Sequence, residues 1–469
     1  MQTVLTGLGE ITQKFKEIIE RKESEIIENI KKGDFISFEK ELKELTDNFA
    51  KDLTESILTE AVDSPEMEQK AKDIAASKRL KVRKTKVKIY IWNGQQIEIP
   101  SYYGFPKPNY TKKKKKRKRK RGPNGNGCHL LLDYWGFLSK SSPSCYSLVA
   151  LLTVICPSFD LAVKVMEQQG ITLNSKTVRR IALALGKRSM KYRVLLNVGK
   201  TETLAGKRVI ISVDGGRTRI RIVKKGTDNE SLKYPKFDTP WKEPKLLVIQ
   251  QIDENGQIDK KSLPIYDTVL GNATAIFKLL ADYLKQLNLK EADKVLFIGD
   301  GAKWIWNRTK KLFKDLGLQS NQYIETIDYY HAVQHLYKTI ELLPAKNLAD
   351  INKSTLIEQM KKLLWEGNIS SLVKRLKELG KGNLPTVNSK LNFYAKQPKL
   401  FNYSYLKKIK MPCGSGIVES AIRRIINLRF KAPSSFWLPE NVEPLMFLRG
   451  VALAGRWNNF IHNFANFKR

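Results

Sequence analysis

The stretch KVLFIGDGAKWIW, residues 294–306, constrains the fold more than any other part of the chain. Its apolar run, 295–298, has the length of a buried strand and is followed by Gly299, Asp300 and Gly301. This pattern predicts a strand that delivers a carboxylate to its C-terminal end and then turns into a helix. Ligands of α/β sheets bind at such strand ends. Asp300 could instead cap the helix, so its interpretation depends on whether other carboxylates converge on it.

A second acid follows the same pattern. In KRVIISVDGGRTRIRIV, residues 207–223, an apolar run leads to Asp214 and a glycine pair. Two more strand patterns, LLVIQQI and LPIYDTVL, come next, followed by a helix over 273–287, the strand before Asp300, a helix over 303–316 and a strand that runs into a helix in QYIETIDYYHAVQHLYKTI. The order β-β-β-α-β-α-β-α predicts an α/β fold, an RNase H-like domain with a mixed five-stranded sheet and flanking helices. The first and fourth strands are neighbours in such a sheet, so we expect Asp214 and Asp300 to lie side by side.

Adjacent carboxylates repel each other, and divalent cations relieve that repulsion. Two metal ions about 3.5–4 Å apart can hold the attacking and leaving oxygens of a phosphoryl transfer. The expected cofactor is Mg²⁺, or Mn²⁺, as two ions, because these metals take oxygen ligands. Glu419, which begins a helix after the glycine-flanked Ser415, is the candidate third acid. It could instead interact with the helix dipole or pair with Arg423.

Other residues compete for a role near this site. Asp328 also stands at a predicted strand end. His331 and His335 have the i, i+4 spacing that can chelate a metal, although packing is the favoured interpretation. Gly299 and Gly301 are expected to let phosphate and metal approach the backbone. The tryptophans that follow, Trp304 and Trp306, are expected in the core rather than as base-stacking residues.

The charge balance favours a polyanionic partner. Lys and Arg number 84 against 47 Asp and Glu, for a formal net charge of +37. The run from Lys112 to Arg121 supplies only ten of these charges, so the excess is spread along the chain. We expect nucleic acid as the partner, whereas a solubilising surface or a membrane-surface protein would be the alternatives. The run itself predicts a flexible loop or linker that contacts phosphates, or an import signal in a eukaryotic cell.

The region before the predicted sheet divides into three parts. Residues 1–62 have the apolar period of amphipathic helices. Asn93-Gly94 predicts a β-hairpin, so 63–144 is expected to hold a basic β-hairpin and the Lys/Arg-rich linker. Residues 145–195 predict a helix-turn-helix-like DNA-binding region. The remaining boundaries are 205–343 and 406–460 for the catalytic domain and 344–405 for a helical insertion.

Three helices are expected in the helix-turn-helix-like region, over 146–155, 158–169 and 175–187. Ser175 could cap the last of them. Its apolar positions would face inward and its basic positions outward, toward DNA. The inward set is Val178, Ile181 and Leu185, and the outward set is Lys176, Arg179 and Arg180.

Cysteine usage and the N-terminus suggest an intracellular protein. The four cysteines include no C-x-x-C pair, which disfavours a zinc ribbon or a disulfide framework. The first residues lack the apolar core of a signal peptide, and the apolar run 148–156 is too short to span a bilayer. A cytoplasmic, nucleoid-associated location without a membrane is expected.

Four blocks occur in the order known from one family: SVDGGRTRIR, IGDGAKWIW, IDYYHAVQHLY, and GSGIVESAIRRIINLRFK followed by FW and GRW. They resemble DDE-type insertion-sequence transposases over about residues 145–460. The resemblance implies an RNase H-like catalytic domain with a helical insertion before the last acid, and Asp214, Asp300 and Glu419 as the metal-binding catalytic triad. It places Tyr330 and His331 beside the site. It also implies a DNA groove lined by Arg423, Arg424, Arg429 and Lys431.

The sequence therefore predicts a transposase that binds the terminal inverted repeats of its own element. It would cleave DNA with metal-activated water and transfer the freed 3′-OH to target DNA, as a dimer or larger homo-oligomer on paired ends. One alternative is a catalytically inactive or domesticated DNA-binding protein, which would bind element ends without nicking them. Another is a structure-selective RNase H-like nuclease or resolvase, which would prefer four-way junctions.

Overall fold

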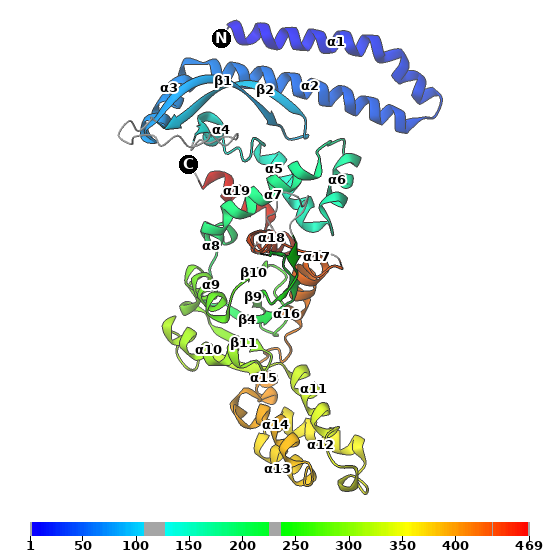
Figure 1. Ribbon diagram of the computed structural model, residues 1–469, viewed down its shortest axis with the longest axis vertical. Helices are drawn as coiled ribbons and strands as arrows, with labels where there is room; N and C mark the ends of the chain where they lie inside the picture. The colour runs from blue at the N-terminus through cyan, green and yellow to red at the C-terminus, as the bar shows by residue number, and fades with distance from the viewer. Residues whose placement is uncertain (1, 107–126, 225–235, 434, 468–469) are drawn as a thin grey trace. The chain divides into compact units, whose positions relative to one another are not determined.

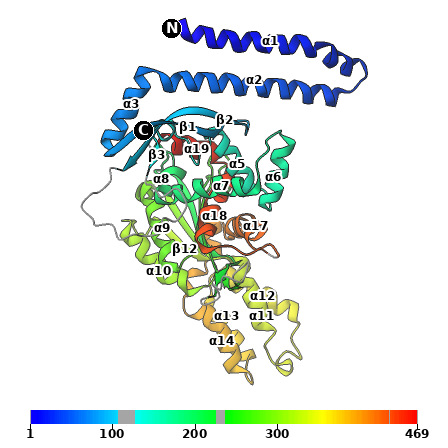
Figure 2. The same cartoon turned by 45° about the horizontal axis from the view of Figure 1, so that its top comes forward.

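A computed structural model describes residues 2–106, 127–224, 236–433 and 435–467 of the chain (Figures 1 and 2). The chain forms two compact units, Met1–Leu185 with Ile461–Arg469, and Gly186–Phe460. The run from Lys112 to Arg121 lies outside the described residues, so the predictions made for it stay predictions.

The first unit begins with two long helices, α1 (Gln2–Lys31) and α2 (Phe35–Asp63), which pack against each other as amphipathic helices should. Phe15 stacks on Phe49 between them, with ring centroids 4.2 Å apart. The predicted helical character of residues 1–62 is confirmed. A third helix, α3 (Pro65–Ser77), follows in a stretch where only a hairpin and a linker were expected.

The predicted hairpin is present and longer than its turn signal indicated. Strands β1 (Leu80–Tyr90) and β2 (Gln96–Pro106) pair antiparallel along their whole length. Gly94 takes a φ of 79° in the turn, a conformation that favours glycine. In both views the hairpin runs alongside α2, which it contacts. The short β3 (Cys128–His129) pairs with β2 and leads into α4 (Leu130–Tyr134).

The three helices of the helix-turn-helix-like region are confirmed as α5 (Pro143–Ile155), α6 (Phe159–Gln168) and α7 (Ser175–Ser189). The cap of α7 differs from the prediction, because Asn174 rather than Ser175 accepts a 2.8 Å hydrogen bond from the Thr177 amide. The sides of α7 are as predicted. Its apolar positions Val178, Ile181 and Leu185 are buried, and its basic positions Lys176, Arg179 and Arg180 are exposed.

The second unit is built around a mixed five-stranded sheet of order β10-β9-β4-β11-β12. Strand β9 runs antiparallel to both β10 and β4, whereas β4, β11 and β12 are parallel. The predicted order of strands and helices is confirmed, and so is the expected pairing of the first strand with the fourth. The sheet strands are β4 (Arg208–Gly215), β9 (Lys245–Ile252), β10 (Ile265–Val269), β11 (Lys294–Gly299) and β12 (Tyr323–Ile327).

Helices cover both faces of this sheet. Phe277 of α9 (Ala273–Gln286) contacts Phe297 of β11 and, in an edge-to-face pair, Trp304 of α10 (Lys303–Asp315), so α9 and α10 pack on the face that Phe297 occupies. The strand register places Gln250 and Tyr266 on the opposite face. There α16 (Gly416–Ala421) packs on β4 and β9, and α18 (Pro439–Leu453) packs on β10.

The segment between β12 and α16 is helical, as predicted for the insertion. Both views show α12, α13 and α14 grouped beyond the sheet, with α11 beside them. Within the described part of the chain, no helix combines the length and the apolar character that crossing a membrane requires. The helices here are α11 (Tyr329–Ile340), α12 (Lys353–Trp365), α13 (Ile369–Leu379), α14 (Leu384–Ala395) and α15 (Tyr403–Lys408).

The stretch after Asp214 also forms short strands, which lie outside the main sheet. It forms two small ribbons, β5 (Thr218–Arg219) with β8 (Trp241–Lys242) and β6 (Ile222–Val223) with β7 (Phe237–Asp238). The remaining elements are α8 (Arg193–Asn197), the π-helix η5 (Ile422–Asn427), α17 (Leu428–Phe430), α19 (Trp457–Asn466) and short 3₁₀ turns at Met190–Tyr192, Leu289–Glu291, Ala345–Asn347 and Pro398–Leu400.

Arg456 ties three parts of the second unit together from a buried position. Its Nη1 and Nη2 donate to the two carboxylate oxygens of Glu202 at 2.8 and 2.6 Å. The same guanidinium donates to the backbone carbonyls of Asn197, Leu263 and Pro264. A planar guanidinium suits this arrangement, because its donors diverge in a fixed fork.

We expect Arg456→Ala to lower the free energy of unfolding by about 3–5 kcal/mol, because it leaves the Glu202 carboxylate and several carbonyls without their buried partner. Urea denaturation followed by circular dichroism measures the loss. The matched control is Arg375→Ala, whose partner Glu378 is exposed, and which should change stability by less than about 0.5 kcal/mol. Equal effects of the two substitutions would contradict this role of Arg456.

Candidate active site

Asp214 and Asp300 lie at the C-terminal ends of neighbouring parallel strands. Ser212 of β4 is opposite Ile298 of β11, so two residues further along each strand Asp300 is level with Asp214. Alternation along the strands puts both side chains on the face that also carries α16. Both are half-buried. The sequence therefore predicted this juxtaposition correctly.

One oxygen of each carboxylate is held by the local backbone. Asp214 Oδ1 accepts a hydrogen bond from the Gly215 amide at 2.6 Å, and Asp300 Oδ1 accepts one from the Ala302 amide at 2.9 Å. Asp300 is not the cap of α10, since Ala302 occupies that position. The strand-end geometry thus orients both acids without using all of their oxygen atoms.

Glu419 is carried by α16, which packs on β4 and β9, and its side chain is exposed. The start of α16 is fixed by Asp328, a side chain only 2% exposed. The Asp328 carboxylate accepts hydrogen bonds from the amides of His331 and Ser415. Asp328, which the sequence left as a competing acid, therefore anchors the turn that precedes Glu419.

The pKa of Asp214 reflects its burial and, to a smaller extent, the acids around it. Burial raises the pKa of Asp214 to about 6; the hydrogen bond from Gly215 opposes this rise, and the charges of Asp300, Glu419 and Glu243 add to it. Like charges disfavour one another's ionised forms in this way when they lie close together.

Glu243 is a fourth acid at this edge, and the sequence analysis missed it. Its carboxylate lies across Gly215, where a Cβ atom would collide with it. Lys245, only 7% exposed, pairs with Glu243 at 2.7 Å. The Lys245 ammonium also lies 4.2 Å from the centre of the Trp304 ring. The antiparallel pairing of β9 with β4 could have predicted the position of Glu243, because it brings the start of β9 next to the end of β4.

The oxygen atoms of these carboxylates are of the type that binds a hard divalent cation. Carboxylate oxygens are the ligands that Mg²⁺ and Mn²⁺ prefer. Burial raises the pKa of Asp214, and the charges of the nearby acids, which a cation would offset, raise it further. Among the described residues, however, no group of three or more His, Cys, Asp or Glu side chains forms a ready-made metal site. Asp214, Asp300 and Glu419 would therefore have to draw closer around a bound ion.

The residues expected beside the site lie at the start of α11. Tyr330 is 65% exposed, and its ring packs next to Gly414. His331 is half-buried at the same turn. His335 stacks on Phe393 with ring centroids 4.1 Å apart. Burial, together with the nearby charge of Lys390, lowers the pKa of His335 to about 4. His335 is therefore a packed side chain, which agrees with the favoured interpretation.

The glycines around Asp300 lie close to protein side chains. A Cβ atom at Gly301 would collide with the Phe393 ring, and one at Gly299 would lie 3.3 Å from Ile305. The lack of side chains at Gly299 and Gly301 thus leaves room for neighbouring protein side chains, and the expected approach of phosphate or metal to the backbone stays a prediction. Trp306 is buried, as predicted, and its Nε1 donates to the Asp300 carbonyl at 2.6 Å.

The four basic residues expected in a DNA groove differ in their placement. Arg423 and Lys431 are exposed. Arg424 is half-buried and donates to the Tyr266 hydroxyl at 3.1 Å. Arg429 departs from the expectation, because it is 4% exposed and its guanidinium lies 4.9 Å from the Trp437 ring centre. In this structure Arg429 packs inside the protein.

The first unit presents a further basic surface on β1. Residues 78–90 contain seven Lys or Arg and no acid. Two of them pair with acids, Lys78 with Asp133 and Lys84 with Asp63. Arg83 lies over two rings of β2, at 5.5 and 5.9 Å from their centres. Cations interleaved with aromatic rings are typical of nucleic-acid surfaces.

We expect Asp214→Asn to stabilise the metal-free protein near neutral pH. Its folded pKa of about 6 exceeds the ordinary value of 3.8, so the folded state loses stability as pH rises through this window. Removal of the charge should therefore add about 1–2 kcal/mol above pH 6 and little at about pH 4. Thermal denaturation in EDTA at both pH values measures the difference. The exposed Asp293→Asn serves as control, and a gain of equal size at both pH values would contradict the explanation.

The comparisons with known proteins do not assign a family. No protein-family model matches the chain, and no curated protein matches it. Among solved structures, one described as the Drosophila P element transposase strand transfer complex is similar over 70% of this chain and 81% of that chain, with a TM-score of 0.25 and 11% sequence identity. A similarity this weak carries no argument about fold or function, which depend on the residues described above.

Proposed function

We propose that this protein is an RNase H-like DDE transposase that binds the terminal inverted repeats of an insertion sequence and catalyses metal-dependent DNA cleavage and strand transfer. The observation that carries the proposal is the position of Asp214 and Asp300 at the ends of two neighbouring parallel strands, beneath the helix that carries Glu419. Acids on neighbouring strand ends, with a third on a helix that packs over them, suit metal-dependent phosphoryl transfer.

In this proposal Asp214 and Asp300 hold the divalent ions and Glu419 completes their ligands. The ions, two Mg²⁺ or Mn²⁺, supply Lewis acidity and lower the pKa of bound water. The chain contributes orientation: the amides of Gly215 and Ala302 each fix one carboxylate oxygen. Asp328 fixes the turn that leads to Glu419.

The reaction would proceed in two chemically similar steps. Water first attacks a phosphodiester at the element end, so one P–O bond forms, another breaks, and a 3′-OH is released. That 3′-OH then attacks a phosphodiester of target DNA in the same manner. Because the first step is a hydrolysis and the second a transesterification, neither needs an oxidant or an additional energy source.

Double-stranded DNA is the proposed partner, both as element ends and as target. The exposed side of α7, with Lys176, Arg179 and Arg180, and the basic β1 surface support this proposal. Paired element ends would require at least a dimer of the chain. Bases would be read by α7 if it enters the major groove as recognition helices do.

We expect Asp300→Asn to abolish cleavage of DNA that carries the gene's own flanking sequences. Loss of a metal ligand removes several kcal/mol of transition-state stabilisation, which corresponds to about 100-fold or more in rate. Strand nicking with Mg²⁺ on denaturing gels measures it, and Asp293→Asn, an exposed acid on the same unit, is the control.

Three outcomes would count against the proposal. Full activity of the Asp300→Asn protein would remove the proposed triad. Binding of element ends without any metal-dependent nicking by the wild-type protein would favour an inactive DNA-binding protein. Faster cleavage of four-way junctions than of linear ends would favour a resolvase.

A further inference from the structure

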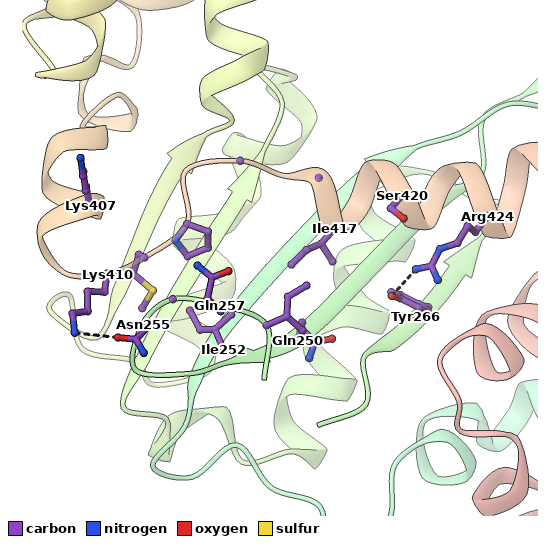
Figure 3. Close-up of a pocket in the computed structure, with 16 residues that line it drawn as sticks. Gln250, Ile252, Asn255, Gln257, Tyr266, Lys407, Lys410, Ile417, Ser420 and Arg424 are labelled. Atoms are coloured by element: carbon purple, nitrogen blue, oxygen red, sulfur yellow. Dashed lines mark hydrogen bonds between the residues drawn. The ribbon is translucent and has the colours of Figure 1, made fainter. Parts of the chain in front are cut away.

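A cavity of about 670 Å³ lies in the second unit, on the sheet face that carries α16. Figure 3 shows it between Gln250 on the sheet and the segment that runs from Lys407 through α16 to Arg424. Tyr266 of β10 closes one end, beside Arg424. Among the residues that line this cavity, only Arg424 has been given a role above, as one of the residues expected in a DNA groove.

The charge of the cavity is of one sign. Lys407, Lys410 and Arg424 line it, and among the described residues no Asp or Glu does. The two of these cations with hydrogen bonds shown in Figure 3 have neutral partners, Asn255 for Lys410 at 3.2 Å and Tyr266 for Arg424 at 3.1 Å. Because no carboxylate offsets these charges at the cavity, it attracts an anion strongly.

Arg424 adds a donor that is available for such an anion. Its Nε is buried and has no hydrogen-bond partner within the described part of the chain. Buried donors are rarely left without an acceptor, so this atom is poised for an acceptor that the protein itself does not supply. A phosphate oxygen would suit a guanidinium particularly well.

The cavity lies close to the proposed catalytic acids along the sheet and along α16. Helix α16 contributes Ser420 to the cavity wall, next to Glu419 in the sequence. Gln250 of β9 is opposite Ile210, four residues before Asp214 on β4. At the usual rise per residue, this lies about 13 Å along the strand from Asp214. A flexible polyanion with its scissile bond at the acids would therefore reach the cavity.

We propose that the cavity binds an unpaired strand of DNA that continues from the cleavage site, with phosphates at Lys407, Lys410 and Arg424. This inference rests on the proposed function. The cavity has the volume of a site for a drug-sized molecule, too small to admit a duplex, whereas a single strand bends and fits narrow basic grooves.

The test measures binding of a fluorescent oligothymidylate of about twelve residues, and of a blunt duplex, to the full chain in EDTA. We expect Lys407→Glu/Lys410→Glu to weaken oligothymidylate binding at least about tenfold. Loss of two phosphate contacts should also reduce the slope of log K against log salt by about 1.4, at about 0.7 per contact for a single strand. The matched control is Lys310→Glu/Lys314→Glu, the same charge change on the exposed side of α10, with a loss below about threefold.

A second measurement, photo-crosslinking, uses the wild-type protein and so does not depend on whether a variant folds. Oligothymidylate carrying 4-thiothymidine should crosslink under ultraviolet light to peptides that contain residues 250–258 or 407–424. Crosslinks confined to other peptides would overturn the proposal, and so would equal losses in the two double variants or binding to neither probe in the wild type.

Failure here is distinguishable from failure of the proposed function, because the binding assay needs no metal. A protein that binds duplex but not the oligothymidylate overturns this inference and leaves cleavage open. An Asp300→Asn protein that still cleaves overturns the proposed function and leaves strand binding to be judged by the lysine variants.

Discussion

The parallel pairing of β4 with β11 is the constraint on which the candidate site depends. Ser212 and Ile298 are opposite each other, and the Ser212 hydroxyl donates a 2.6 Å hydrogen bond to the Ile298 carbonyl in the buried sheet. A shift of register by one residue would turn every side chain of one strand to the other face. This buried bond, two residues before each acid, therefore holds Asp214 and Asp300 side by side against their mutual repulsion, while apolar burial of both strands stabilises the pairing.

The third acid depends on a different kind of support. Glu419 stands on a short helix whose first turn follows a glycine-rich segment, and such a segment has little conformational preference of its own. Asp328 at the end of β12 fixes the conformation of this segment, because its carboxylate accepts hydrogen bonds from the His331 amide at the start of α11 and from the Ser415 amide. The Tyr329 amide adds a 2.9 Å bond to the Cys413 carbonyl. The sheet thus positions Asp214 and Asp300 through chain continuity, and supports the turn before Glu419 through the buried side chain of Asp328.

Local patterns in the sequence predicted the elements that carry their own periodicity. The strands before Asp214 and Asp300, the helices α9 and α10 and the buried side of α7 follow from apolar spacing alone, and the neighbouring positions of the two acids follow from strand order. Glu243 was not predictable in this way, because its place near Asp214 depends on the antiparallel alignment of β9 with β4. The burial of Arg429 depends on a contact with Trp437 that no local pattern encodes. For Asn174 the cap signal was present, one residue before the serine that was chosen.

The helical insertion is connected to the site through aromatic packing. Phe393 of α14 fills the space beside Gly301, directly after Asp300, and stacks on His335 of α11. Gly301 is thus required because any side chain there would displace an aromatic ring. The turn that follows Asp300 is consequently shaped from one side by Trp306, which donates to the Asp300 carbonyl, and from the other by a residue almost a hundred positions away. A change in the packing of the insertion would move this turn, and with it the carboxylate, so the insertion belongs to the physical support of the site rather than to its periphery.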